Sequence, residues 1–251
     1  MDLLVLENDG LRECSVSMSN ALARASHSLS LVEKRVLAAT IAKLDSRKGT
    51  RSHAHLAEFQ KIRITALDYA ETYGVDHKNA YDHLTRAADN LFERQFSIKT
   101  TSEKKERITR YRWVSIATYA KDEGFIEVSF TPEVYPHINA LRNQYTTYKL
   151  KNAASFRSAY SWRLYEIARS WLKHCENGKT VRITLENLKH QLDWPKSYKW
   201  NDAKKRSIDP AIEEIAKFEK LEISYTVEKQ GRSVHALAFL FKEKEQMEMD
   251  I

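Results

Sequence analysis

The sequence has little glycine, proline or cysteine. Six Gly and four Pro occur among 251 residues, well below the roughly 7% and 5% of an average chain. This scarcity disfavours collagen-like, glycine-rich and loop-dominated all-β folds, so we expect helix to be the majority element. The two cysteines, Cys14 and Cys175, have no C-x-x-C companion, which excludes a disulfide framework and a cysteine-rich zinc site.

Long apolar runs and common catalytic motifs are also missing. No apolar run approaches the roughly 18 residues of a membrane span, and the apolar start at residues 3–6 has no basic segment before it. G-x-S-x-G and H-E-x-x-H do not occur, and G-K-T at residues 178–180 lacks the earlier glycine of a phosphate-binding loop because position 173 is Lys. We expect a soluble cytoplasmic protein without membrane contact, enzymatic activity, cofactor or metal.

Positive charge is in excess and is concentrated in the middle of the chain. Lys and Arg number 41 against 34 Asp and Glu, a net charge of +7. Residues 94–112 hold seven basic residues, and residues 142–173 hold seven against the single acid Glu166. Residues 1–19 and 245–251 are expected to be an acidic N-terminal tail and a C-terminal tail. A basic centre of this kind points to a polyanionic partner.

A long internal repeat fixes the expected domain count. The sequence I-R-I-T at residues 62–65 returns as V-R-I-T at residues 181–184. In each copy a helical pattern precedes this strand, and a short helix, a breaker, a longer helix and alternating strands around a charged turn follow it. This order predicts a helix-rich α+β fold of two tandem winged-helix domains, at residues 20–148 and 149–244.

A winged helix can bind double-stranded DNA, because its second helix fits the major groove while its hairpin reaches phosphates or the minor groove. Cations at the start of the second copy's long helix oppose the helix dipole, so an anionic partner would compensate them. Pro210 is expected to kink or split that helix. A solvated basic face is the alternative for these cations, and Tyr81 and Leu84 could simply pack. The second-copy candidates are Lys199, Lys204, Lys205 and Arg206 on the helix and Lys229 and Arg232 on the wing; the first-copy candidates are Lys78, Asn79, Tyr81 and Arg86 on the helix and Lys99, Lys104, Lys105 and Arg107 on the wing.

Five phrases in order resemble the iteron-binding replication initiators of plasmids, over about residues 20–242. The resemblance implies two winged-helix domains that bind origin repeats (iterons) as a monomer and open replication with host proteins. It also implies a homodimer, in equilibrium with the monomer, that represses its own gene at an inverted repeat. The carboxy-terminal domain would be the main DNA reader, and the amino-terminal domain would both bind DNA and form the dimer interface. The phrases are residues 25–34, V-S-F-T-P (128–132), Q-Y-T-T-Y (144–148), S-W-R-L-Y-E (161–166) and P-A-I-E-E-I (210–215).

Two other functions compete with this interpretation. A rolling-circle nickase would use a metal held by His53 and His55 and a nucleophilic Tyr145 near Lys149, although the two histidines follow a polar segment. A plain winged-helix transcriptional repressor would need only one DNA-reading domain. The basic helix and hairpin in both copies favour two DNA-reading domains.

Overall fold

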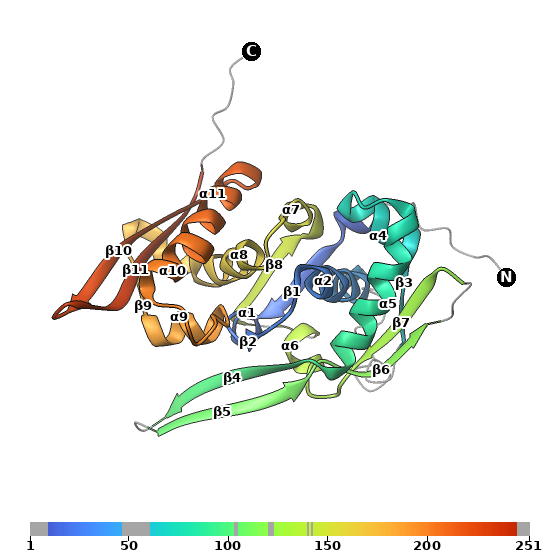
Figure 1. The fold of residues 1–251 in the computed structure, drawn as a ribbon, viewed down its shortest axis with the longest axis horizontal. Coiled ribbons are helices and arrows are strands. Elements are labelled where there is room, and N and C mark those ends of the chain that lie inside the picture. Colours follow the sequence, from blue (N-terminus) through green and yellow to red (C-terminus); the bar gives the residue numbers. More distant parts are fainter. Residues whose placement is uncertain are drawn as a thin grey trace, which may run out of the picture.

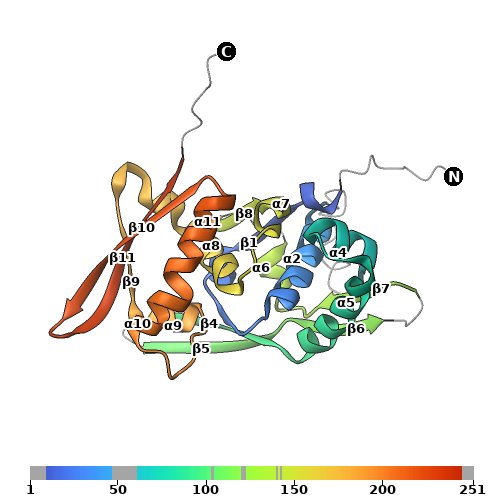
Figure 2. The same ribbon diagram turned by 45° about the horizontal axis from the view of Figure 1, so that its top comes forward.

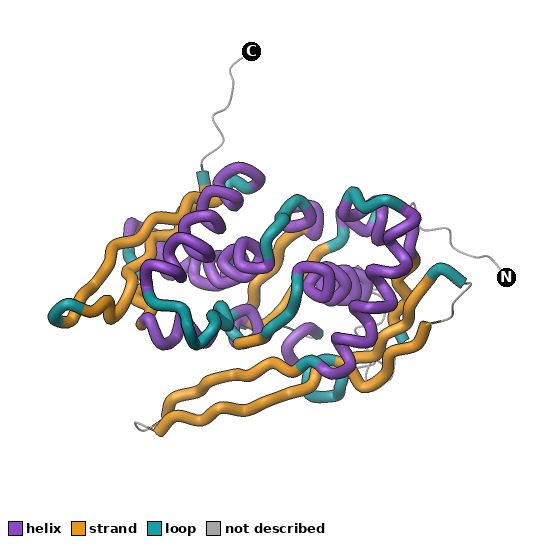
Figure 3. The backbone as a smooth tube through the Cα atoms, viewed as in Figure 1, coloured by secondary structure: helices purple, strands orange, loops and turns teal. Residues whose placement is uncertain are grey.

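Each copy of the repeat folds into a winged helix, and the two winged helices lie side by side (Figure 1). The computed structural model describes residues 10–46, 61–102, 105–119, 123–139, 141 and 143–244. The expected helix-rich α+β architecture of two winged helices is confirmed. The boundary between residues 148 and 149 stays a prediction. The helices gather in the middle, and the hairpins extend outward from them (Figure 3).

The first of the two winged helices, called the first lobe, is organised around α2 (Leu31–Ser46), which packs against α5 (His77–Glu93). Thr65 caps α4 in a capping box with Asp68, and Gly74 ends that helix with φ of +62°, a conformation that favours glycine. Leu84 and Leu91 face the interior from α5. The elements are α2 (Leu31–Ser46), β3 (Ile62–Thr65), α4 (Ala66–Tyr73), α5 (His77–Glu93), β4 (Gln95–Ser102), β5 (Lys105–Arg112), β6 (Val114–Tyr119), β7 (Phe125–Phe130) and α6 (Tyr135–Ile138).

The second lobe repeats this plan, with α8 packed against α11 as α2 is against α5. Thr184 caps α9 as Thr65 caps α4. The sheet order β10-β11-β9 makes β10 and β11 the wing. The elements are α7 (Leu150–Ala154), α8 (Ala159–Trp171), η3 (Leu172–Gly178), β9 (Val181–Thr184), α9 (Leu185–Gln191), α10 (Trp200–Ala203), η4 (Lys204–Ile208), α11 (Asp209–Phe218), β10 (Leu221–Gln230) and β11 (Ser233–Glu243).

Pro210 does not split the second recognition helix. Instead, α10, the π-helical turn η4 and α11 follow one another without a break. Proline has no amide hydrogen to donate to the carbonyl four residues earlier, and its ring crowds that carbonyl. The wider π turn just before Pro210 relieves both problems, so the helix continues through residue 218.

The sequence-based assignment of the first wing is wrong. The alternation of apolar and polar residues predicts one wing strand at residues 110–118. This segment instead belongs to two strands, because Trp113 is buried and the chain changes sheet there. β6 pairs with β7, and β7 pairs with β3, which matches β10-β11-β9 in the second lobe. The first wing is therefore β6–β7. The hairpin β4–β5 belongs to another sheet with β2 (Ser26–His27) and extends toward α9 (Figure 2).

Residues 11–19, expected in the acidic tail, are folded. After η1 (Leu11–Glu13), β1 (Ser15–Ser19) pairs along its whole length with β8 (Tyr145–Lys149), and α1 (Asn20–Ala23) follows. Val16 and Met18 are buried. This strand has five residues and only two buried apolar side chains, so its alternation was too short to be recognised within an acidic segment.

The carboxyl group of Glu219 is expected to make stability pH-dependent. It accepts hydrogen bonds from Asn152 (3.2 Å) and Tyr165 (3.3 Å), and burial raises its pKa from 4.5 to about 7. Between pH 4.5 and 7 this carboxyl group is therefore protonated in the folded protein and ionised in the unfolded chain. The stabilisation that results is fully present below pH 4.5 and is lost as the pH rises through 7. Glu219→Gln should raise the free energy of unfolding by about 1 kcal/mol at pH 8 and change it little at pH 4.5. Urea unfolding at both pH values measures this, and an equal gain at both would refute it.

Candidate nucleic-acid interface

The exposed cations of the second lobe gather on η4 and on the residue before α10. Lys199, Lys204, Lys205 and Arg206 are all exposed. On the inner side of the same turn Ile208 is fully buried, and the Trp194 indole donates to the Ser207 hydroxyl at 2.8 Å. Because the inner side is anchored in this way, the three consecutive cations must project outward.

Two of these cations have weak partners on the protein. Lys204 lies 3.4 Å from the Asp209 carboxylate, and the Arg206 guanidinium lies 5.7 Å from the centre of the Tyr198 ring. Both groups are exposed, so these contacts hold the side chains only loosely. Lys205 has neither an ion pair nor a hydrogen bond within the described ranges. The cluster therefore retains charge that an anionic ligand could neutralise.

The second wing carries Lys229 and Arg232 at its tip. Both are exposed, and Gly231 between them has φ of +61° and so allows the tight turn. Phe239 and Phe241 anchor β11 in the core. The wing is thus rigid at its base and cationic at its end, which suits phosphate contact.

The recognition helix of the first lobe, α5, is less basic. Lys78, Asn79 and Arg86 are exposed, whereas Tyr81 is half-buried and Leu84 is fully buried. The side chain of Leu84 therefore packs in the core, which is the alternative to DNA contact that the sequence left open. The exposed face offers two cations and an amide, a set that can bind phosphates and base edges.

The predicted residues of hairpin β4–β5 do not form one surface. Lys105 and Arg107 are exposed, and Lys104 lies outside the described residues. Lys99 is not at a hairpin tip: its ammonium group lies 2.7 Å from Glu106 and 3.2 Å from Glu186 of α9, and its side chain is only 17% exposed. The hydrogen bond to Glu106 raises the pKa of Lys99. Lys99 thus connects the two lobes, and it is not a free phosphate contact.

Sequence reasoning missed the cations that the β4–β5 hairpin presents beside its predicted ones. Arg110 is exposed on β5, and Arg112 nearby donates to the Phe92 carbonyl at 3.0 Å. Their place in the basic run at residues 94–112 was the available signal. Each is an odd number of residues from Lys105 and Arg107 on β5, so the two pairs of cations lie on opposite faces of the strand.

The structure gives little support to a nickase site. Tyr145 begins β8 and is 50% exposed, while His53 and His55 lie outside the described residues. Within the described ranges, no three His, Cys, Asp or Glu side chains gather in a way that could hold a metal. No described helix combines the length and apolarity needed to cross a bilayer.

Comparison with known proteins places the chain in a family. Residues 15–169 match the model described as "Initiator Replication protein, WH1", and residues 184–241 match "Initiator Rep protein, WH2". An Escherichia coli "Replication initiation protein" is 24% identical over 95% of this chain and 73% of its own length. The Escherichia coli "PI protein" is 26% identical over 92% of this chain and 83% of its own length.

One solved structure shares the fold across nearly the whole chain. The crystal structure of the Pi initiator protein in complex with iteron DNA aligns with a TM-score of 0.68 and 23% identity, covering 93% of this chain and 99% of that chain. The resemblance seen in the sequence is thereby confirmed. The chain belongs to the family of initiator replication proteins with two winged-helix domains, WH1 and WH2.

Proposed function

We propose that this chain is a plasmid replication initiator that binds repeated double-stranded DNA at an origin through both winged helices. The observation that carries the proposal is the outward-facing cluster Lys204, Lys205 and Arg206 on the second recognition helix, together with the cationic wing tip of the same lobe. Family membership and the likeness to a protein solved with iteron DNA support it. The chain would act in the bacterial cytoplasm with host replication proteins and without a catalytic step of its own.

A homodimer would repress the gene of the protein at an inverted repeat, in equilibrium with the iteron-binding monomer. The edge strand β6 of the first lobe supports this second mode. Among the described strands it pairs only with β7, and it exposes Ile116 (37%) and Tyr119 (48%). An exposed apolar strand edge favours pairing with the same edge of a second copy, which would give two-fold symmetry. Such a dimer matches an inverted repeat in a way that the monomer does not.

Footprinting on the DNA beside the encoding gene tests the proposal directly. The purified chain should protect tandem direct repeats, each with two major-groove segments about one helical turn apart. It should also protect an inverted repeat at the promoter. Protection of one segment per site would favour a plain repressor, and protection of neither kind of repeat would overturn the proposal.

Tyr145→Phe separates initiation by binding from initiation by nicking. Because the proposed function uses no tyrosyl–phosphate bond, plasmid replication and iteron affinity should both match the wild type within about twofold. Transformation frequency of an origin plasmid supplied with each protein measures this. A folded variant that binds DNA normally but supports no replication would favour the nickase.

A further inference from the structure

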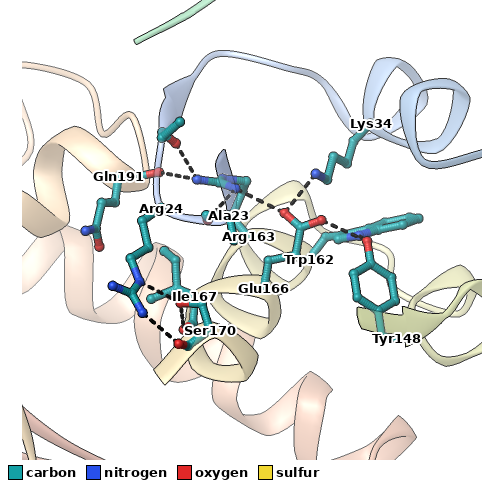
Figure 4. A network of polar contacts seen from close by, with 11 residues as sticks. Ala23, Arg24, Lys34, Tyr148, Trp162, Arg163, Glu166, Ile167, Ser170 and Gln191 are labelled. Carbon is teal, nitrogen blue, oxygen red and sulfur yellow. Dashed lines mark hydrogen bonds and ion pairs between the residues drawn. The ribbon is translucent and has the colours of Figure 1, made fainter. Parts of the chain in front are cut away.

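Buried charges join the two lobes between α8 and α2 (Figure 4). One Glu166 oxygen on α8 accepts from Lys34 of α2 at 2.8 Å and from Arg163 at 3.0 Å, and the other accepts from the Tyr148 hydroxyl at 2.8 Å. The side chains of Lys34, Arg163 and Glu166 are 3%, 5% and 0% exposed. Separating these groups would leave charge unpaired in the interior, so the network strongly favours one arrangement.

The Arg163 guanidinium also ties the backbones of both lobes together. It donates to the carbonyls of Ala23 and Ala25 in the first lobe and to that of Gln191 at the end of α9 in the second. The distances to Ala23 and Gln191 are both 3.1 Å. A planar guanidinium fixes the directions of its donors, so these contacts set orientation as well as distance.

A second set of contacts surrounds this centre. Arg24 donates to the hydroxyl and carbonyl of Ser170 at 2.8 and 2.6 Å, and its guanidinium lies 3.3 Å from the centre of the Trp171 ring. The Ser97 hydroxyl of β4 lies 3.1 Å from the His190 ring of α9. Contacts at separate points resist rotation as well as translation of one lobe on the other.

We propose that the interlobe clamp, defined as Arg24, Lys34, Arg163 and Glu166, fixes the spacing between the two DNA segments that the protein accepts. This inference rests on the proposed function. An insertion of two base pairs turns the second segment by about 70° and moves it by about 7 Å. With the lobes held rigidly, one recognition helix then loses its groove. The clamp residues are positioning residues that act on DNA only through the two lobes.

The test compares affinities for four DNA duplexes. They are the natural repeat, the repeat with one or two base pairs inserted between its protected segments, and a duplex with the second-lobe segment alone. The variants are Lys34→Met, which leaves the Arg163–Glu166 pair intact, and Arg24→Ala, whose side chain is half-buried. Lys43→Met is the matched control, because it breaks a half-buried pair with Asp68 (2.6 Å) that lies within the first lobe.

Wild type and the control should bind the two-base-pair insertion at least about tenfold more weakly than the natural repeat. In Lys34→Met and Arg24→Ala the ratio of the affinity for the natural repeat to the affinity for the two-base-pair insertion should fall toward one. The affinity for the single segment should not change. A general loss of folded protein lowers all four affinities together and leaves the ratio as it was. An unchanged ratio in both variants overturns the clamp proposal alone. A wild type that ignores spacing overturns the two-reader function as well.

Discussion

Lys205→Ala combined with Arg206→Ala is expected to weaken binding to the origin repeat by about 10- to 100-fold at physiological salt. Both side chains project from η4, whose inner side is fixed by Ile208 and Ser207. Each lost phosphate contact removes about one unit from the slope of log affinity against log salt, so the slope should flatten by about two units. Fluorescence anisotropy over a salt series measures both quantities.

The matched control removes two exposed cations from the other end of the same helix. Lys217→Ala with Lys220→Ala gives the same change in net charge, and these residues lie at and just beyond the C-terminal end of α11. The control should keep most of the wild-type slope, because only cations near phosphates release counterions from DNA. Equal flattening in both double variants would mean that net charge, and not the η4 cluster, determines affinity.

Glu166→Gln is expected to destabilise the protein by about 3–5 kcal/mol, because it leaves two buried cations without a carboxylate. Lys34→Met should cost much less, since Arg163 and Glu166 still neutralise each other at 3.0 Å. Burial lowers the pKa of Lys34 and of Arg163. In the Glu166→Gln variant one of the two cations should therefore lose its proton, and Lys34 should lose it more readily than Arg163.

Thermal and urea unfolding at pH 7 without DNA compare the two variants. A loss of this size should lower the melting temperature of Glu166→Gln by roughly 10 °C. If Lys34→Met were as unstable as Glu166→Gln, the balance of two cations against one carboxylate would not explain the stability of the network.

Local sequence patterns were sufficient to predict the repeated modules. The strands at residues 62–65 and 181–184 show the same alternation of buried and exposed positions, and each ends on a threonine that caps the next helix. Alternation, capping and helical spacing depend on neighbours in the chain, which is why these elements could be predicted from the sequence.

Contacts between distant residues could not be predicted in the same way. β1 pairs with β8 across 130 residues, and β4–β5 pairs with β2 instead of β7. The alternation of a strand does not say which partner it takes. Arg163 and Glu166 counted as surface charge in the basic run at residues 142–173, yet both are buried, because Lys34 and backbone carbonyls far away in sequence satisfy them.

In the proposed function both lobes place a recognition helix on one duplex. An iron chelate attached to cysteine at position 77 of α5 or position 201 of α10, with Cys14 and Cys175 replaced, would cut the DNA beside each helix. Both attachment sites, His77 and Asn201, are exposed and lie outside the proposed contact set. On a single repeat the two cleavage patterns should centre about one helical turn apart. Cleavage from position 201 alone would contradict the account.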